Sequence, residues 1–297
     1  MNLGVINFTL ILLLYVIVIL IISMMLLYSS YYFMNEHFNS YNELIDILKS
    51  LKNNNKNYMN YGYWDKKHMN IEDANIKLCD MIYEKIGDSK KILDVGCGFG
   101  EQDIYWYNKN NALDITAIDI NESSIGYAKK TIDVNKIKFM VNSATNLKFN
   151  DNEFDCIISL ESAFHYDKRV DFFKEAYRVL KPGGKLIMAD LIYDDSDKLN
   201  IFKKISQKAF INFFNIPKSN NINISEYLNQ LNDLRFETNI IDITNNTFKP
   251  YYKYFFNNLD SRNLLFNIYK YISKFYINNL CDGNTGFKYV ITSCIKK

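Results

Sequence analysis

Short apolar runs separated by polar segments divide the middle of the chain into predicted strands and helices. Runs rich in branched residues that stop at an acidic or polar residue predict buried strands. They lie at 91–95, 114–120, 137–141, 154–160 and 186–190. The segments between and before them predict helices over 70–87, 101–110 and 168–180. Strands and helices that alternate in this order predict an α/β fold around a parallel sheet.

The amino-terminal segment has a different pattern. Between Gly4 and Leu27 only three residues are polar, and the first charged residue is Glu36. About 20 apolar residues suffice to span a bilayer, so we expect residues 1–34 to form a retained transmembrane anchor. The alternative is a cleaved signal peptide, which has a basic start and an apolar core of about 7–15 residues.

The charges around this segment predict its orientation. No Lys or Arg precedes it, whereas five lysines follow it between positions 49 and 67. By the positive-inside rule we expect a single-pass membrane protein whose catalytic body lies in the cytosol. Residues 35–60 predict an amphipathic stalk helix followed by a linker rich in Asn and Lys.

The polar break after the first predicted strand carries the strongest chemical signal. Asp94 ends the apolar run, and Gly96, Gly98 and Gly100 follow at alternate positions. Such a turn lets a ligand lie directly against the backbone. The dinucleotide pattern would place its third glycine where this chain has Glu101, whose carboxylate disfavours a phosphate. The turn therefore suits a ligand with a cationic ammonium group.

This turn resembles motif I of the class I S-adenosylmethionine-dependent methyltransferases, Asp-x-Gly-x-Gly-x-Gly. The run from Arg178 to Gly184, a helix end followed by a proline and a glycine turn, is similar to the same family. The resemblance implies a Rossmann-like seven-stranded sheet within a domain at 61–297. Residues 238–244 are then the sixth strand, and 287–294 the final, antiparallel edge strand.

Spacing assigns one cofactor residue independently of the resemblance. Asp119 ends the second predicted strand about 20 residues after the glycines, where an acid binds ribose hydroxyls. The alternative is a helix-capping role. The resemblance implies further contacts, with Ser143 standing where the family has an acid that reads adenine. Tyr61 either covers the methionine end or only packs. The full expected set is Tyr61, Asp94, Gly96, Cys97, Gly98, Gly100, Asp119, Ile120, Ser143, Ala144 and Leu160.

The loop after the fourth predicted strand is the expected place of the chemistry. Methyl transfer from a sulfonium needs alignment, and a hydroxyl acceptor also needs a base. His165 lies in this loop, which resembles that of macrolide and ansamycin O-methyltransferases. The resemblance pairs it with Asp190 as a catalytic pair. The alternative is that His165 contacts the cofactor or caps a helix. Glu161 either orients the acceptor or is a solvated acid.

Composition limits the classes of ligand and partner that the chain can be expected to bind. The net charge of +2 and the lack of a basic face argue against nucleic acid, and the five cysteines show no metal-binding spacing. Two aromatic insertions, at about 194–220 and 248–280, resemble the lid that this family places over its acceptor. They predict a small, lipophilic acceptor, although they could also only cover the edges of the sheet.

The sequence thus predicts a membrane-anchored S-adenosylmethionine-dependent methyltransferase of small molecules. O-methylation is favoured over C-methylation of a sterol- or quinone-like lipid. A non-catalytic cofactor-binding scaffold is the alternative from another class, and the intact glycines and Asp119 speak against it. A dehydrogenase is disfavoured by Glu101.

Overall fold

A computed structural model describes residues 57–66, 69–194, 204, 207–208, 211, 214–258 and 286–297. The predicted anchor and nearly all of the predicted stalk lie outside these residues, as do large parts of the two predicted insertions. Within the described ranges, no helix combines the length and the apolar character needed to cross a bilayer.

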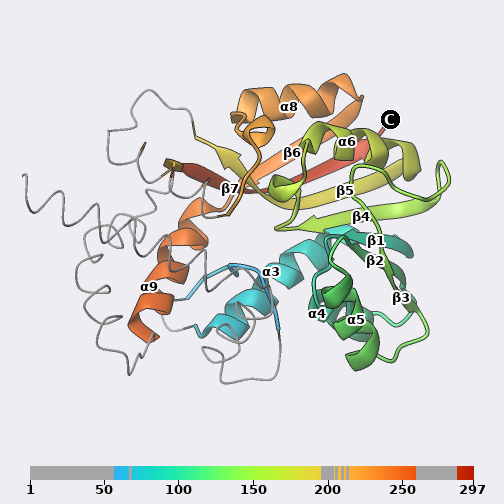
Figure 1. The fold of residues 1–297 in the computed structure, drawn as a ribbon, viewed down its shortest axis with the longest axis horizontal. Coiled ribbons are helices and arrows are strands. Elements are labelled where there is room, and N and C mark those ends of the chain that lie inside the picture. Colours follow the sequence, from blue (N-terminus) through green and yellow to red (C-terminus); the bar gives the residue numbers. More distant parts are fainter. Residues whose placement is uncertain are drawn as a thin grey trace, which may run out of the picture. The chain divides into compact units, whose positions relative to one another are not determined.

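A seven-stranded sheet organises the described part of the chain (Figure 1). Its order is β3-β2-β1-β4-β5-β7-β6. The first five strands are parallel, and β7 runs antiparallel to both of its neighbours. The bounds are β1 (Lys91–Val95), β2 (Asp114–Asp119), β3 (Ile137–Val141), β4 (Phe154–Leu160), β5 (Leu180–Tyr193), β6 (Phe236–Asp242) and β7 (Phe287–Lys296).

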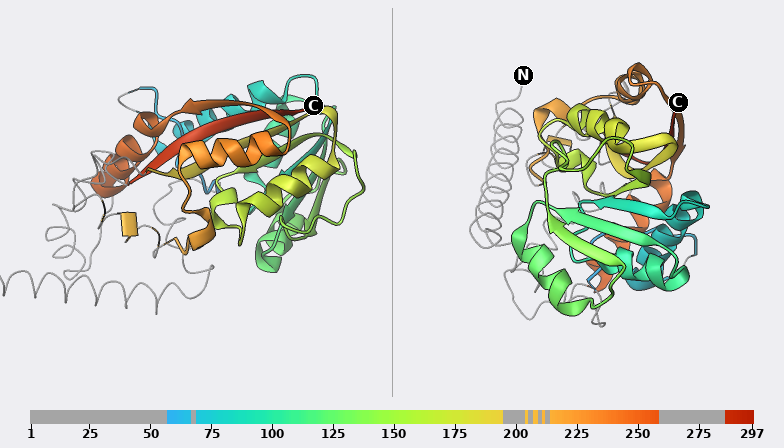
Figure 2. Two further views of the ribbon diagram at one scale, coloured as in Figure 1. Left: turned by 90° about the horizontal axis from the view of Figure 1, so that it is seen from above. Right: turned by 90° about the vertical axis from the view of Figure 1, so that its right-hand side faces the viewer.

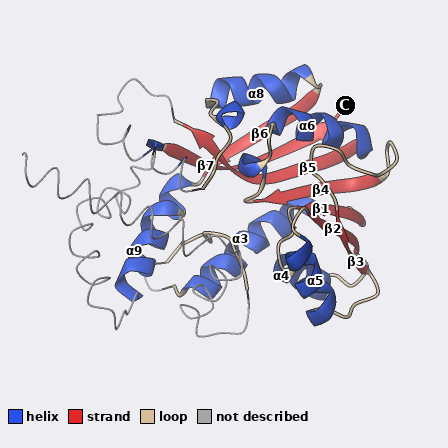
Figure 3. Cartoon of the chain, in the orientation of Figure 1, coloured by secondary structure: helices blue, strands red, loops and turns tan. Residues whose placement is uncertain are grey.

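Helices cover both faces of this sheet (Figure 3). Successive side chains of a strand point to opposite faces, so Ile92 and Leu93 belong to two different cores. The first core includes residues of α3 (Ile71–Ile86), α4 (Glu101–Lys109), α5 (Glu122–Thr131) and α9 (Phe248–Asn258). The second includes residues of α6 (Arg169–Val179) and α8 (Ile224–Asp233). Figure 2 shows α6 and α8 on one side of the red strand β7 and α3 on the other.

Asparagine caps fix where three of the helices begin. The side chains of Asn70, Asn121 and Asn223 each accept a hydrogen bond from the backbone N–H three residues later. Such caps satisfy donors that the first helical turn leaves unpaired. Short 3-10 turns complete the described elements: η1 (Ala163–His165), η2 (Lys218–Asn220) and η3 (Thr244–Asn246).

The predicted strands agree closely with the observed ones, with one error of position. Residues 287–294 were expected at the edge of the sheet, but β7 lies between β5 and β6. Nearly all of its residues are buried or half-buried, as expected for a strand with a neighbour on each side. The edge strand is β6, whose residues are mostly exposed or half-buried.

Candidate functional site

The site lies where the direction of winding changes between β1 and β4. These two strands are neighbours, but the chain continues from β1 toward β2 and from β4 toward β5. In open α/β sheets, ligands bind outside the carboxyl ends of the strands at such a switch point. The glycine turn follows β1 here, and the loop 161–168 follows β4 (Figure 1).

The three glycines of the turn serve different purposes. All three have positive φ, at 81° for Gly96, 56° for Gly98 and 77° for Gly100. A Cβ on Gly96 would lie 2.4 Å from the Ser162 side chain, and one on Gly100 would lie 2.6 Å from the Phe139 ring. A Cβ on Gly98 would meet nothing within 4 Å. Gly98 is therefore the position at which a ligand can approach the backbone.

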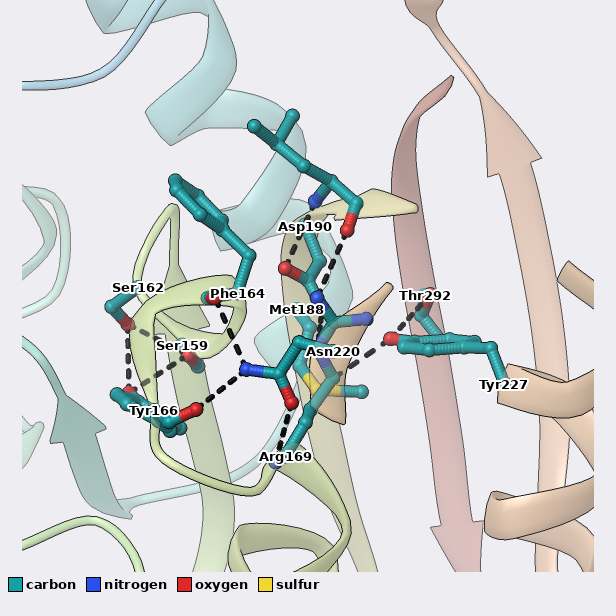
Figure 4. Close-up of polar contacts among 11 residues, drawn as sticks. Ser159, Ser162, Phe164, Tyr166, Arg169, Met188, Asp190, Asn220, Tyr227 and Thr292 are labelled. Carbon is teal, nitrogen blue, oxygen red and sulfur yellow. Dashed lines mark hydrogen bonds and ion pairs between the residues drawn. The ribbon is translucent and has the colours of Figure 1, made fainter. Parts of the chain in front are cut away.

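Hydroxyl groups of the β4 loop hold the start of this turn. Figure 4 shows the hydroxyls of Ser159, Ser162 and Tyr166 bonded to one another. Ser162 Oγ and Tyr166 Oη donate to the Val95 carbonyl at 2.8 and 3.0 Å, and Ser159 Oγ lies 2.8 Å from Ser162 Oγ. Burial raises the pKa of the Tyr166 hydroxyl, which keeps it a donor. No role was predicted for these hydroxyls. Their position at the end of a buried strand and in the loop after it is the sequence signal that could have identified them.

Asp119 organises the next part of the site. Its Oδ2 accepts the Gly98 N–H at 2.9 Å and its Oδ1 accepts the Asn121 N–H at 2.9 Å. A carboxylate has about four acceptor positions, so acceptor capacity remains for ribose hydroxyls. The helix α5 is capped by Asn121 through Ser124 N–H, so Asp119 is not its cap. Burial raises the pKa of Asp119, and its backbone hydrogen bonds oppose this.

An exposed apolar side chain lies next to Asp119 in the sequence. Ile120 is 75% exposed, an unusual state for a large apolar side chain at a strand end. The end of β3 is tied to the same place, because Asn142 N–H donates to the Asp119 carbonyl at 3.1 Å. Ser143 and Ala144 follow and are half-buried, and Ser143 Oγ lies 3.2 Å from the Thr145 hydroxyl.

Asp94 lies beneath the turn and is fully buried. Gln102 Nε2 donates to Asp94 Oδ2 at 3.0 Å and to the Cys97 carbonyl at 3.2 Å. Burial raises the pKa of Asp94 to about 7, although hydrogen bonds from Gln102 and Asp103 oppose the shift. The Cys97 thiol is also buried, and burial raises its pKa, so it is not a reactive thiolate.

Glu161 is the carboxylate at the end of β4. It follows the buried Leu160 and adopts a left-handed φ of 53°, which is uncommon for a residue other than glycine. Its own N–H donates to the Ala189 carbonyl at 2.8 Å. Its Oε1 accepts the Tyr61 N–H at 2.7 Å and the Tyr289 hydroxyl. These bonds bring together three segments that are far apart in the sequence.

Aromatic rings gather around Tyr61, whose backbone bonds Glu161, and we call this set the tyrosine cluster. The Tyr61 ring is its centre, with ring centroids 4.7 Å from Tyr251 and 5.3 Å from Phe248. Both predicted insertions contribute to it, since Phe214 and Tyr252 also contact Tyr61 at 6.5 and 6.1 Å. The cluster consists of Tyr61, Phe214, Phe248, Tyr251, Tyr252 and Tyr289. Burial raises the pKa of the Tyr61, Tyr251 and Tyr289 hydroxyls.

The expected pair of His165 and Asp190 is not formed. His165 is exposed on η1, with its ring 4.2 Å from the Phe164 ring, and it bonds the backbone of Phe214. Asp190 is fully buried and pairs with Arg169, with 3.2 Å between Oδ2 and Nε (Figure 4). A buried carboxylate needs a charged partner, and the neighbouring arginine supplies it.

This ion pair belongs to a network that holds the β4 loop in place. Arg169 Nη2 donates to the Leu191 carbonyl at 3.0 Å. Asn220 accepts the Arg169 N–H at 2.9 Å, and its Nδ2 donates to the carbonyls of Phe164 and Tyr166 at 3.1 and 2.5 Å (Figure 4). Asp190 therefore helps to position the loop that carries Glu161 and His165.

The residues at the switch point fit S-adenosylmethionine. Gly98 leaves open space against the backbone, and the exposed Ile120 offers an apolar surface for adenine. Asp119 retains acceptor capacity for the ribose, and Asp94 supplies an acid near the methionine end. All four features lie at the carboxyl ends of β1 and β2.

Comparison with known proteins agrees with this geometry. A family model described as a methyltransferase domain matches residues 93–188. The erythromycin 3''-O-methyltransferase of Saccharopolyspora erythraea is 32% identical over 212 residues, which cover 68% of this chain and 69% of that protein. The 27-O-demethylrifamycin SV methyltransferase of Amycolatopsis mediterranei is 32% identical over 167 residues, covering 53% of this chain and 59% of that protein.

A solved structure shows the same fold. The cyclopropane synthase MmaA2 from Mycobacterium tuberculosis is similar with a TM-score of 0.67 at 16% identity, covering 83% of this chain and 93% of that one. Together with the extent of the sequence match and the geometry of the switch point, this leads to one conclusion. The chain belongs to the class I S-adenosylmethionine-dependent methyltransferases that act on small molecules.

Proposed function

We propose that this methyltransferase methylates a hydroxyl group of a lipophilic small molecule, with Glu161 as the base. The observation that carries the proposal is the placement of the Glu161 carboxylate at the carboxyl end of β4, within the tyrosine cluster. The next residue, Ser162, bonds the Val95 carbonyl and so lies against the glycine turn. The names of the two relatives, which act on erythromycin and 27-O-demethylrifamycin SV, support an oxygen acceptor.

Different residues of the chain have different roles in this proposed reaction. When bound, S-adenosylmethionine supplies a methyl group that is already activated by its sulfonium. Asp119 and the backbone at Gly98 would hold the ribose and the methionine part. Glu161 would accept the proton of the acceptor hydroxyl as the oxygen bonds to the methyl carbon. The rings of the tyrosine cluster exclude water from this side of the site.

Glu161 is a better candidate base than His165 because of its surroundings. Glu161 is held by two hydrogen bonds from separate segments, and a fixed position favours catalysis. His165 lies on η1 with an exposed side chain. The catalytic roles of His165 and Asp190 remain predictions from the resemblance, and the observed contacts of Asp190 favour a positioning role.

The chemistry of the tyrosine cluster indicates the class of acceptor. Six aromatic side chains from four segments converge beside Glu161, and large apolar ligands favour such surfaces. We propose that the insertions 194–220 and 248–280 act as a lid over a bulky apolar acceptor. We also propose that residues 1–34 anchor the enzyme to a membrane and that residues 35–60 link this anchor to a cytosolic catalytic domain at 61–297. An anchor would bring the site close to lipid-soluble acceptors.

C-methylation is a second candidate, and the tyrosine cluster is the observation that favours it. Methylation of a carbon–carbon double bond leaves a positive charge on the acceptor, and the faces of aromatic rings stabilise cations. Tyr61, Tyr251 and Tyr252 lie with ring centroids within 4.7 to 6.1 Å of one another beside an acidic group. Glu161 would then remove a proton from carbon instead of oxygen.

The test is a methylation screen with labelled donor against hydroxylated polyketides and membrane lipid extracts. For an accepted substrate, Glu161→Gln should lower kcat about 10²–10⁴-fold, because a general base is lost without a change of shape. Glu226→Gln, at an exposed position on α8, is the matched control and should keep full activity. NMR of the product would separate O-methyl from C-methyl transfer. Full activity of Glu161→Gln would exclude Glu161 as the base.

A further inference from the structure

Two carboxyl groups lie together beneath the glycine turn, and both are fully buried. Asp94 is the residue before the last of β1, on the side of the sheet that faces α3 and α4, and Asp103 is in the first turn of α4. Each side chain is 0% exposed. They interact with each other, since Asp94 raises the pKa of Asp103 and Asp103 lowers the pKa of Asp94.

Three of their four carboxyl oxygen atoms lack a donor among the described residues. Gln102 Nε2 donates to Asp94 Oδ2 at 3.0 Å. Among the described residues, no donor reaches Asp94 Oδ1 or either oxygen of Asp103 when both groups are treated as ionised. An unsatisfied buried carboxylate is costly, so a proton between the two groups is the simplest way to satisfy them.

The charges around the pair also favour a proton between the two groups. The other titratable groups near the pair are the thiols of Cys79 on α3, Cys97 in the turn and Cys156 on β4, the Tyr166 hydroxyl, and the carboxylate of Asp119 on β2. Neither aspartate has a lysine or arginine within ion-pair distance in the described ranges. Two carboxyl groups that are buried next to each other cannot both be ionised. Burial, and then the neighbouring Asp94, raise the pKa of Asp103 well above its ordinary value.

We infer that Asp103 is a positioning residue for the cofactor: it keeps a proton at neutral pH and donates it to Asp94, so that Asp94 presents one fixed negative charge beneath the glycine turn. This role rests on the assignment of Asp94 to the ammonium end of S-adenosylmethionine. Asp103 thereby acts through Asp94 and does not itself touch the ligand. Asp94 was predicted to be a cofactor residue. Asp103 was not, because it lies within a predicted helix.

The test compares two ligands that differ at the methionine end. S-adenosylhomocysteine carries the ammonium group, whereas 5′-methylthioadenosine keeps the nucleoside and lacks the amino acid part. Binding of both is measured by calorimetry on the full-length chain and on its variants Asp103→Ala and Asp103→Asn at pH 7.5. The alanine variant removes the donor. The asparagine variant replaces it with an amide N–H of nearly the same shape.

The expected results separate positioning from folding. Asp103→Ala should weaken S-adenosylhomocysteine binding at least about tenfold, because Asp94 Oδ1 must then take up a proton or remain without a donor. Asp103→Asn should stay within about threefold of the wild type. Binding of 5′-methylthioadenosine should be the same in all three proteins, which also demonstrates an intact fold. The infrared spectrum should show a protonated carboxyl band in the wild type that Asp103→Asn lacks.

Three outcomes would overturn the role of Asp103. They are unchanged S-adenosylhomocysteine binding in Asp103→Ala, an equal loss for both ligands, and an unchanged protonated carboxyl band in Asp103→Asn. Failure of the cofactor assignment is distinguishable, because the wild type itself would then bind neither ligand.

Discussion

The two halves of the proposed active site, one for the cofactor and one for the acceptor, are built in different ways. The cofactor half is made by short segments at the carboxyl ends of β1, β2 and β3, and backbone groups hold it, as in the Gly98 N–H bond to Asp119. The acceptor half, around Glu161, is made by side chains from segments up to 228 positions apart, from Tyr61 to Tyr289. A cofactor that is constant across a family suits a local backbone motif. An acceptor that varies needs a surface whose parts can change separately.

The stability of the acceptor half should depend on the buried ion pair of Asp190 with Arg169. Asp190→Asn leaves the Arg169 guanidinium buried without its counter-charge, so we expect the free energy of unfolding to fall by about 3–5 kcal/mol. Urea unfolding of the wild type and the variant measures this difference in the free energy of unfolding. The exposed pair of Asp171 and Lys174 supplies a control, since Asp171→Asn should cost less than about 1 kcal/mol. An Asp190→Asn protein as stable as the wild type but without turnover would instead support the predicted catalytic role.

Removal of the Asp119 side chain should weaken cofactor binding without disturbing the acceptor half. Asp119→Ala deletes the acceptor for the ribose hydroxyls and for the Gly98 N–H. We expect S-adenosylhomocysteine to bind about 10–100-fold more weakly, which corresponds to about 1.5–3 kcal/mol for bonds to a charged group. Calorimetry measures the affinity, and near-ultraviolet circular dichroism should show the tyrosine cluster unchanged. Asp88→Ala, at an exposed position, is the control.

The carboxyl pair of the cofactor half should make stability depend on pH. Burial raises the pKa of Asp94 from 3.8 to about 7, so between these values the folded protein holds a proton that the unfolded chain releases. This stabilising contribution is present in full at low pH and is lost as the pH rises through about 7. For one proton, the free energy of unfolding falls by about 1.4 kcal/mol per pH unit within this window.

Urea unfolding at pH 5, 6 and 7 measures this dependence. Because carboxylates elsewhere in the protein also titrate, the informative quantity is the difference between the wild type and Asp103→Asn. Burial also raises the pKa of Asp103, so the variant loses one of the two carboxyl groups that bind protons more tightly in the folded protein, and its decline in stability with pH should be shallower. Equal slopes would mean that Asp103 holds no extra proton in the folded protein.

Features that depend on short stretches of sequence were predicted well. The strand at 91–95 matches β1 (Lys91–Val95), and the expected helix at 70–87 matches α3 (Ile71–Ile86) with Gly87 following it. The glycine turn and Asp119 lie together as their spacing predicted. Apolar runs, caps and glycine turns act over a few residues, so their effect can be read from the local sequence.

Features that depend on distant segments were missed or misplaced. The order of β6 and β7 is decided by which strand pairs with β5, and the apolar pattern of β7 alone does not say so. The resemblance paired Asp190 with His165, whereas Arg169 is the partner in the structure. Asp103 gave no signal, because its importance comes only from its burial against Asp94.

The sequence by itself therefore determined the α/β fold, the glycine turn and the acid beside that turn, since each follows from periodicity and spacing within one strand–turn–helix unit. The tertiary structure decided which charges are buried together and which rings surround Glu161. The physical reason is that burial and electrostatic coupling depend on distance in space, and residues such as Tyr61 and Tyr289 become neighbours only when the sheet has formed.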